Sequence, residues 1–189
     1  MANTTKKKSA SPSAKTHSKT AHGGMGAQLT AERDAEHGFA ASRALGENLQ
    51  RVLVDLIELA LQGKQAHWNV VGANFRDTHL QLDEIVDAAR GFADTVAERM
   101  RALHAVPDGR SDVVAETTTL PAFPPGEIAT REVVDLMTQR LDDVAGTCRT
   151  VHDPVDQEDP TSADILHDIL ERIEQLSWMV SAENRKPRA

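Results

Sequence analysis

Apolar residues recur at intervals of three and four along four segments of the chain, a spacing that places them on one face of an α-helix. The first segment covers about residues 44–68, and the second begins after Asn74 and runs to about His104. The third covers about residues 130–152 and the fourth about 162–183. The core-facing positions predicted by this pattern are Leu45, Leu49, Val52, Leu53, Leu56, Ala60, Leu82, Ile85, Val86, Ala89, Phe92, Val96, Met100, Leu103, Val133, Met137, Leu141, Val144, Cys148, Val151, Ile165, Ile169, Ile173, Leu176 and Val180.

The segments between these helices indicate how the helices are connected. "NVVGAN" interrupts the first two, and Asn74 with Asp77 three residues later is typical of a helix start, so the Asn74 side chain is predicted to cap the second helix. Residues 107–129 contain four of the eight prolines and predict a long connection, in which "SDVVAET" forms a short helix. No segment alternates with a period of two. The predicted fold class is all-α, a four-helix bundle with a long connection between helices two and three, as in ferritin-like folds.

The N-terminal part differs in composition from the rest. Residues 1–28 contain almost no apolar side chains that a core could bury, so we expect a disordered tail, followed by a bundle domain over 29–184 and a short basic end over 185–189. The formal net charge is −8, but beyond the tail the chain carries 16 basic and 29 acidic residues. Such a tail suits sequence-independent binding to DNA phosphates, and the alternative is a merely solubilising tail. The tail holds no acid and five lysines, Lys6, Lys7, Lys8, Lys15 and Lys19.

The cysteine content and the absence of long apolar runs indicate in which cellular compartment the protein works. Cys148 is the single cysteine, so no disulfide can form within the chain, and its place on an apolar stripe predicts a core residue. No apolar run reaches the roughly 20 residues of a membrane span. The lysines near the N-terminus are not followed by the apolar region of a secretory signal. We expect a cytoplasmic, nucleoid-associated protein with no membrane partner.

A polar stripe lies beside the apolar stripe of the second helix. His79 and Asp83 form an i,i+4 pair on it, and Asp94 and Glu98 form another. This spacing brings two side chains within reach of one metal ion. Arginines share the stripe, so an ordinary solvated helix face explains the pattern equally well.

Helix geometry limits how the two pairs can cooperate. Asp83 and Asp94 lie about 16 Å apart along a straight helix, whereas a ligand atom lies about 2 Å from its metal. One chain therefore cannot bring both pairs to one ion, but an antiparallel copy related by a two-fold axis could. His67, near the end of the first helix, could add a second imidazole. Two histidines, two aspartates and one glutamate suit iron or zinc. The chain has no Glu-x-x-His pair, which argues against a conventional di-iron site within one bundle.

The same residues resemble the ferroxidase signature of the Dps family, the DNA-binding mini-ferritins of starved bacteria. The flanking stretches "NVVGANF", "DEIVD" and "ADTVAERM" also match, as does the turn "AVPDG". The resemblance covers about residues 40–185. The signature reads His67-Trp68, His79-x-x-x-Asp83 and Asp94-x-x-x-Glu98-Arg99.

The resemblance implies a homododecamer that forms a hollow shell and takes iron as its metal. It implies that His67, His79 and Asp83 of one chain meet Asp94 and Glu98 of a partner at a ferroxidase site. Fe(II) would be oxidised there, preferably by hydrogen peroxide rather than dioxygen, and ferric mineral would be stored in the cavity. Such a ferroxidase-type oxidoreductase protects DNA from oxidative damage, and family members with lysine-rich tails bind DNA.

Two smaller expectations follow from the resemblance. The acidic stretch "HDPVDQEDPTSAD" resembles the lining of the family's three-fold pore, with Asp156, Asp159 and Asp164 as candidates, although a solvated loop is the alternative. Trp68 either packs beneath His67 or takes up stray oxidising equivalents. Other functions stay open beside the mini-ferritin: a nucleoid-compacting structural protein with an incidental metal site, or a plain helical interaction bundle.

Overall fold

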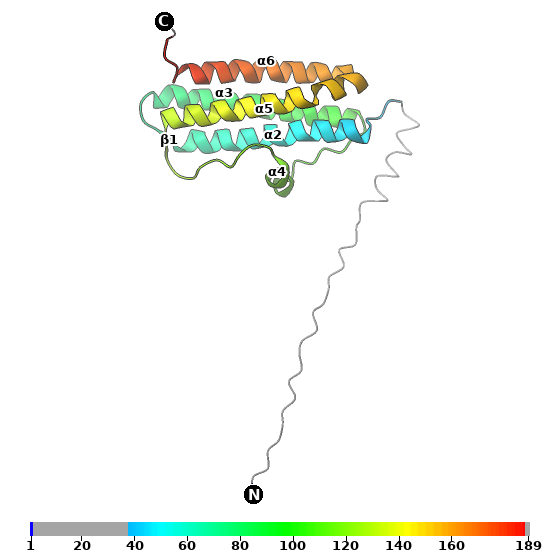
Figure 1. Ribbon diagram of the computed structural model, residues 1–189, viewed down its shortest axis with the longest axis horizontal. Helices are drawn as coiled ribbons and strands as arrows, with labels where there is room; N and C mark the ends of the chain where they lie inside the picture. Colours follow the sequence, from blue (N-terminus) through cyan, green and yellow to red (C-terminus); the bar gives the residue numbers. More distant parts are fainter. Residues whose placement is uncertain (2–37, 188–189) are drawn as a thin grey trace.

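The computed structural model describes Met1 and residues 38–187, and in this range it has the predicted all-α fold. Four long helices lie side by side, and a short helix, α4, interrupts the long connection between the second and third of them (Figure 1). The short helix occupies the "SDVVAET" stretch, as predicted. The helices are α2 (Arg43–Asn69), α3 (Phe75–Ala102), α4 (Ser111–Thr117), α5 (Thr130–Glu158) and α6 (Pro160–Ala182).

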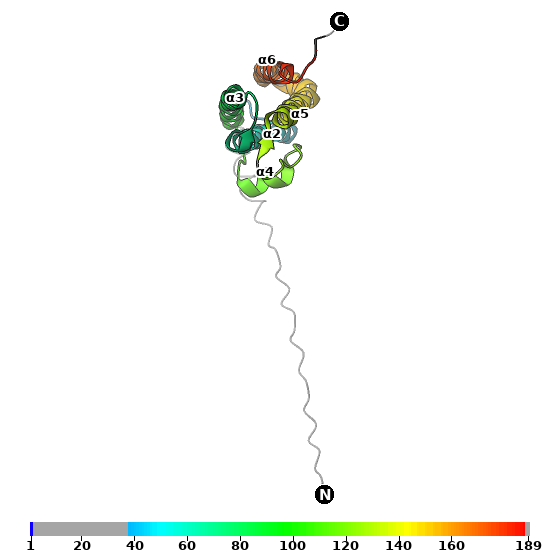
Figure 2. The same cartoon turned by 90° about the vertical axis from the view of Figure 1, so that its left-hand side faces the viewer.

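The four long helices enclose one core. α2 packs against α3 and α5, and α6 packs against the same two helices from the other side, while α4 contacts α2 from outside the bundle (Figure 2). The predicted core-facing positions are buried, except that Phe92 and Ile165 lie at the edge of the core and are partly buried. Cys148 is completely buried, and this burial raises the pKa of its thiol to about 12. Its predicted role as a core residue is confirmed.

A two-residue parallel bridge ties the long connection back to the end of α2. β1 (Val70–Val71) pairs with β2 (Ile128–Ala129), directly before α5 begins. Val70 and Ile128 are both buried, so the bridge closes that end of the bundle with apolar side chains. The sequence did not predict it, because two residues are too few to show a strand period.

The predicted end of the third helix near His152 is wrong. α5 continues to Glu158 with Pro154 inside it. Proline removes one helical hydrogen bond and usually ends or kinks a helix. Here Val155 is fully buried and extends the core-facing stripe of Val151 beyond the proline, so packing outweighs the local preference. α6 then begins with Pro160 in its first turn, a position that tolerates proline.

The predicted capping bond of Asn74 is also wrong. Asn74 occupies the N-cap position of α3, but its backbone is left-handed, with a φ of 57°, and its side chain makes no capping hydrogen bond. The Asn74 amide instead donates to Glu183, beyond the end of α6. The turn after β1 therefore uses Asn74 for its tolerance of positive φ and for a tertiary contact.

The structure does not test the predictions made for the two ends of the chain. The five tail lysines and the proposed domain boundary at residue 29 lie outside the described residues, as do residues 188–189. Within the described part, no helix combines the length and apolar character needed to cross a membrane.

Candidate metal centre

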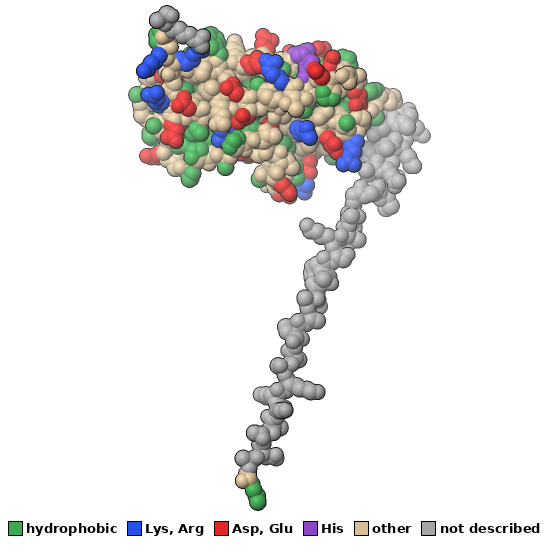
Figure 3. Space-filling view, in the orientation of Figure 1, with side chains coloured by type: hydrophobic (Ala, Val, Ile, Leu, Met, Phe, Trp, Pro, Cys, Tyr) green, Lys and Arg blue, Asp and Glu red, His purple; other side chains and the backbone are tan. Residues whose placement is uncertain are grey.

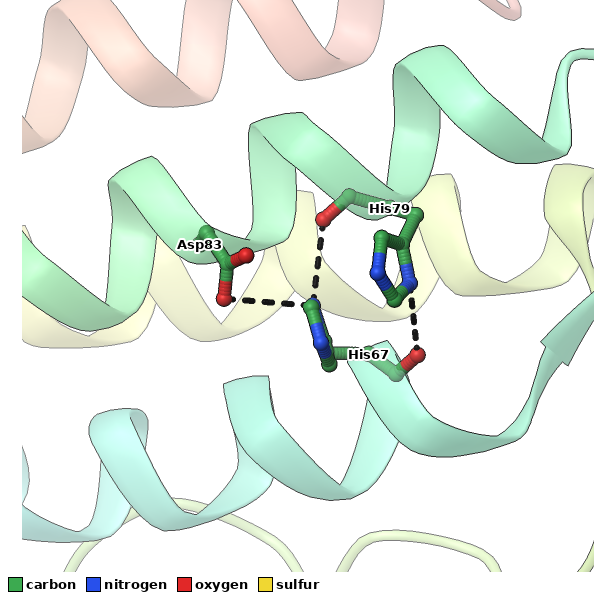
Figure 4. A group of neighbouring side chains, drawn as sticks. All are labelled: His67, His79 and Asp83. Atoms are coloured by element: carbon green, nitrogen blue, oxygen red, sulfur yellow. Dashed lines mark hydrogen bonds and ion pairs between the residues drawn. The ribbon is translucent and has the colours of Figure 1, made fainter.

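Three of the predicted ligands meet where α2 runs into α3. His67 lies in the last turn of α2, and His79 and Asp83 lie one turn apart near the start of α3 (Figure 4). Their possible ligand atoms all lie within 4.8 Å of one another. Within residues 38–187, no other group of three or more histidine, cysteine or acidic side chains is compact enough to share one ion.

The two imidazoles are held by main-chain atoms. The Nδ1 atom of His67 lies 3.1 Å from the carbonyl oxygen of His79, and the Nδ1 atom of His79 lies 3.0 Å from the carbonyl oxygen of His67. A carbonyl oxygen only accepts, so each Nδ1 donates its proton and each Nε2 keeps a lone pair. The rings stack with centroids 3.6 Å apart. This arrangement fixes the tautomer that a metal-binding histidine needs.

Asp83 completes the group as an anion. Its Oδ1 atom accepts a hydrogen bond from the Lys64 ammonium at 2.5 Å and lies 3.2 Å from the Nδ1 atom of His67. The hydrogen bond from Lys64 lowers the pKa of the Asp83 carboxyl below its usual value; partial burial opposes this shift and the nearby histidines add to it. Asp83 is therefore ionised near neutral pH. The Lys64 ammonium therefore already binds one oxygen of a carboxylate that a metal ion would use.

The sequence reasoning missed Lys64. It lies on α2 three residues before His67, a spacing that places both side chains on the same face of the helix. The spacing of Lys64 and His67 could have indicated that both side chains reach the same site. The ion pair itself could not be predicted from α2, because it forms only when α3 packs beside α2 and brings Asp83 opposite Lys64.

The other two predicted ligands lie farther along α3. Asp94 and Glu98 are exposed and do not belong to the compact group. Asp94 borders a surface hollow between α2 and α3, which Leu61 and Pro107 also line. One chain thus assembles three of the five ligands, and completion of the site by a second chain stays a prediction.

Trp68 follows His67 in sequence and is exposed. Its side chain is 70% exposed in the single chain. The prediction that it packs beneath His67 within its own chain is therefore wrong. Trp68 is the last residue but one of α2, and its neighbour His67 already occupies the face toward α3, so Trp68 faces solvent.

The three candidate pore residues differ in their surroundings. Asp156 and Asp164 are exposed, and their role in a pore stays a prediction. Asp159 is buried, and it accepts hydrogen bonds from Arg99 Nη2 at 2.7 Å and from the Ser162 hydroxyl at 2.5 Å. Burial alone would raise the pKa of Asp159, but these hydrogen bonds and the charge of Arg99 lower it. Its carboxylate joins α3 to the α5–α6 junction within one chain.

Comparisons with known proteins agree with this geometry. A family model described as the ferritin-like domain matches residues 46–188. The fine tangled pili major subunit of Haemophilus ducreyi is 36% identical over 143 residues, which are 76% of each chain. The DNA protection during starvation protein of Agrobacterium fabrum is 33% identical over 71% of this chain and 83% of that protein.

A solved structure extends the likeness to three dimensions. The high-iron form of Dps from Microbacterium arborescens superposes with a TM-score of 0.74 at 31% identity, over 79% of this chain and all of that one. The chain therefore belongs to the ferritin-like proteins and, within them, to the Dps family.

Proposed function

We propose that this protein is an iron-storing mini-ferritin that protects DNA and oxidises Fe(II) at sites shared between two chains. The observation that carries the proposal is the geometry of His67, His79 and Asp83. One ring nitrogen from each imidazole and one carboxylate oxygen lie within 4.8 Å of one another at the partly exposed junction of α2 and α3. This set resembles one half of a Dps ferroxidase site.

The donor types suit iron as the substrate. Imidazole binds the incoming ferrous ion, and carboxylates favour the ferric product. Two Fe(II) ions each lose one electron, and these electrons break the O–O bond of one hydrogen peroxide molecule to give two hydroxide equivalents. Lys64 must release Asp83 as iron binds, so the metal replaces the ammonium as the partner of the carboxylate. Hydrogen peroxide is the proposed oxidant, in preference to dioxygen.

A second copy of the chain would complete the site with Asp94 and Glu98. Both side chains are exposed and lie on the same helix as His79 and Asp83, as a two-fold arrangement of antiparallel helices requires. Large apolar side chains on the surface of the single chain support burial by neighbouring copies in a dodecameric shell. Leu61, Leu80, Trp68 and Trp178 are between 48% and 70% exposed.

Iron loading followed by size-exclusion chromatography tests the assembly and its activity together. Twelve chains of 20.6 kDa would elute near 250 kDa, and iron added as Fe(II) with hydrogen peroxide should co-elute with the protein. The variants His79→Ala and Asp83→Ala should elute at the same volume without iron. A dimer-sized peak without iron would contradict the storage function.

Mixed assemblies test whether the site is shared. We would coexpress one chain carrying Asp94→Ala and Glu98→Ala with a second chain carrying His79→Ala and Asp83→Ala. Each variant alone should be inactive. In a random mixture, about a quarter of the sites would regain all five ligands from two chains, so about a quarter of the activity should return. No recovery would mean that each site is built by a single chain.

We also propose that the lysine-rich tail binds DNA without sequence preference, which would associate the protein with the nucleoid in the cytoplasm. One tail of five lysines binds weakly at physiological salt, but twelve tails on one particle would act together. Deleting residues 1–28 should abolish DNA retardation in a gel and leave iron oxidation unchanged. Unchanged retardation would refute the tail's role. Retention of DNA binding with no peroxide-driven iron oxidation in the full chain would favour the nucleoid-compacting structural protein.

A further inference from the structure

A second pair of histidines lies on the opposite side of the bundle from α2. His152 of α5 and His167 of α6 face each other with their Nε2 atoms 2.7 Å apart and their ring centroids separated by 4.7 Å. Both lie toward the α5–α6 junction, whereas His67 lies at the other end of the bundle, where α2 meets α3 (Figure 1). The pair is therefore separate from the metal centre described above.

Each imidazole of this pair has a carboxylate beside its other nitrogen. The Nδ1 atom of His152 lies 3.0 Å from Asp153 Oδ1, and the Nδ1 atom of His167 lies 3.7 Å from Asp164 Oδ1. Asp153 lies within hydrogen-bond distance and favours, for His152, the tautomer with the proton on Nδ1 and the lone pair on Nε2. Asp164 is too far from His167 for a hydrogen bond and acts there as a neighbouring negative charge. Histidines that bind metals in proteins commonly donate their second ring nitrogen to a carboxylate in this way.

At 2.7 Å the Nε2 atoms of the two rings are within hydrogen-bond distance, so one of them donates a proton to the lone pair of the other. A metal ion that displaces this proton would be bound by the lone pairs of both Nε2 atoms. A zinc-type ion lies about 2.0–2.1 Å from each imidazole nitrogen, so tetrahedral binding would place the two Nε2 atoms about 3.3 Å apart and require them to separate by about 0.6 Å. The His167 side chain is 58% exposed and can make this adjustment without disturbing the core.

The surrounding charges also favour a cation. Asp156 lies one turn after His152, and Glu171 lies one turn after His167, and both are exposed acids. The nearby cation Arg149 is bound to Glu174. Histidine and acidic side chains share the exposed face over α6 (Figure 3). Clustered negative charge raises the local concentration of cations.

We propose that His152 and His167 bind one divalent first-row transition-metal ion through their Nε2 atoms. Asp153 orients the His152 imidazole, Asp164 adds negative charge beside His167, and water completes the coordination. Two protein ligands at an exposed position make a site that exchanges its ion with solvent. Its two imidazole ligands come from one chain and are not those of the proposed iron-oxidation centre.

Zinc titration by calorimetry tests the proposal on the full-length, assembled protein. The His67→Ala, His79→Ala double variant serves as background, because it removes the imidazoles of the first centre. Zinc sulfate should bind there at about one ion per chain through the proposed pair. Adding His152→Ala or His167→Ala should eliminate this binding while the elution volume stays unchanged. All other histidines are the same in every variant, so the difference isolates this pair.

Matched acidic variants test the orienting carboxylate. Asp153→Asn should weaken zinc binding toward the 10–100-fold loss typical of outer-shell partners, whereas Asp168→Asn removes the same charge beside His167 and should change affinity much less. Equal effects of the two variants would show that only general charge matters and would overturn the orienting role.

Copper provides a spectroscopic check. In the same background, one equivalent of Cu(II) should give an electron paramagnetic resonance spectrum with hyperfine coupling to two imidazole nitrogens, and His167→Ala should remove one of them. Zinc binding of unchanged stoichiometry and affinity in His167→Ala would overturn the proposal.

Discussion

The imidazoles of His67 and His79 are each hydrogen-bonded to the main-chain carbonyl of the other residue, across 3.1 and 3.0 Å. Their positions are therefore set by the backbones of α2 and α3. Any change in the separation of these two helices must move both ligands. The spacing of the helices is thus part of the metal centre.

The close approach of α2 and α3 at Gly63 sets this spacing. A Cβ atom added at Gly63 would lie 2.8 Å from Val86 Cγ2, and valine is stiff at χ1, so the helices would have to separate. Gly63→Ala should lower the free energy of unfolding by about 1–3 kcal/mol despite alanine's helix preference. It should also weaken zinc binding to the His67 centre. Urea denaturation and zinc titration at one protein concentration measure both effects.

Gly91→Ala is the matched control for this change. Gly91 lies in α3, where an added Cβ meets nothing within 4 Å. This variant should be as stable as the parent, or more stable by up to about 1 kcal/mol. If Gly63→Ala behaves like Gly91→Ala, the close approach does not limit the helix spacing.

Lys64 should compete with metal ions for Asp83. Its ammonium lies 2.5 Å from Asp83 Oδ1, and both side chains are partly exposed, with 24% and 39% of their surfaces accessible. A pair of this exposure is worth less than about 1 kcal/mol, so Lys64→Met should raise the affinity for zinc about two- to fivefold. It should also return the pKa of Asp83 toward its usual value. Calorimetric zinc titrations over a pH series measure both.

The control for Lys64 is Arg76→Gln. Arg76 is an exposed residue of α3, and its loss changes the net charge by the same amount. Its effect on zinc affinity should be small. Weaker zinc binding in Lys64→Met than in the parent would show that Lys64 positions Asp83 more than it competes for it.

The Arg99–Asp159 ion pair should make stability depend on pH. Arg99 Nη2 lies 2.7 Å from Asp159 Oδ2, and only 23% and 10% of the two side chains are exposed. Asp159→Ala leaves Arg99 without its anion and should cost about 1–3 kcal/mol at neutral pH. The folded state lowers the pKa of Asp159, so this stabilisation is present above the unfolded pKa near 3.9. It is lost as the pH falls through the lower, folded value.

Urea midpoints of the parent and Asp159→Ala between pH 3 and pH 7 test this dependence. The difference between them should shrink toward the acidic end. Glu47→Ala provides the control, because the Arg43–Glu47 pair is 91% and 60% exposed and should contribute little at any pH. A difference for Asp159→Ala that stays constant across the range would contradict the pH argument.

Asp55 should anchor the long connection to the bundle. It is completely buried in α2, and its carboxyl oxygens accept four hydrogen bonds. The donors are the Thr118 hydroxyl, the Thr119 amide and hydroxyl, and the Thr147 hydroxyl, at 2.7 to 2.8 Å. Asp55→Ala leaves these donors without an acceptor and should cost about 2–4 kcal/mol. It should also speed proteolysis within residues 107–129.

Asp142→Ala is the corresponding control. Asp142 is exposed and accepts a single hydrogen bond, from the Ser177 hydroxyl at 2.6 Å, so its loss should cost less than about 1 kcal/mol. Thermal melts and limited proteolysis of the two variants at equal concentration measure the contrast. Equal melting temperatures would mean that Asp55 does not hold the connection.

The sequence by itself determined the helices and the kinds of ligand. Burial of one face every 3.6 residues is a local property of the chain, so the spacing of residues such as Leu49 and Leu53, or Met137 and Leu141, predicts the bundle. The i,i+4 spacing of His79 and Asp83 is equally local, and the helix rise alone separates that pair from Asp94.

Only the tertiary structure decided the features that join residues distant in sequence. Three contacts form only because neighbouring helices bring the residues together. These are the Lys64–Asp83 ion pair, the Arg99–Asp159 ion pair and the contact between the His152 and His167 imidazoles. Packing likewise allows α5 to continue past Pro154, since the burial of Val155 outweighs the loss of one helical hydrogen bond. Such contacts depend on how the helices pack, which the local spacing of side chains does not specify.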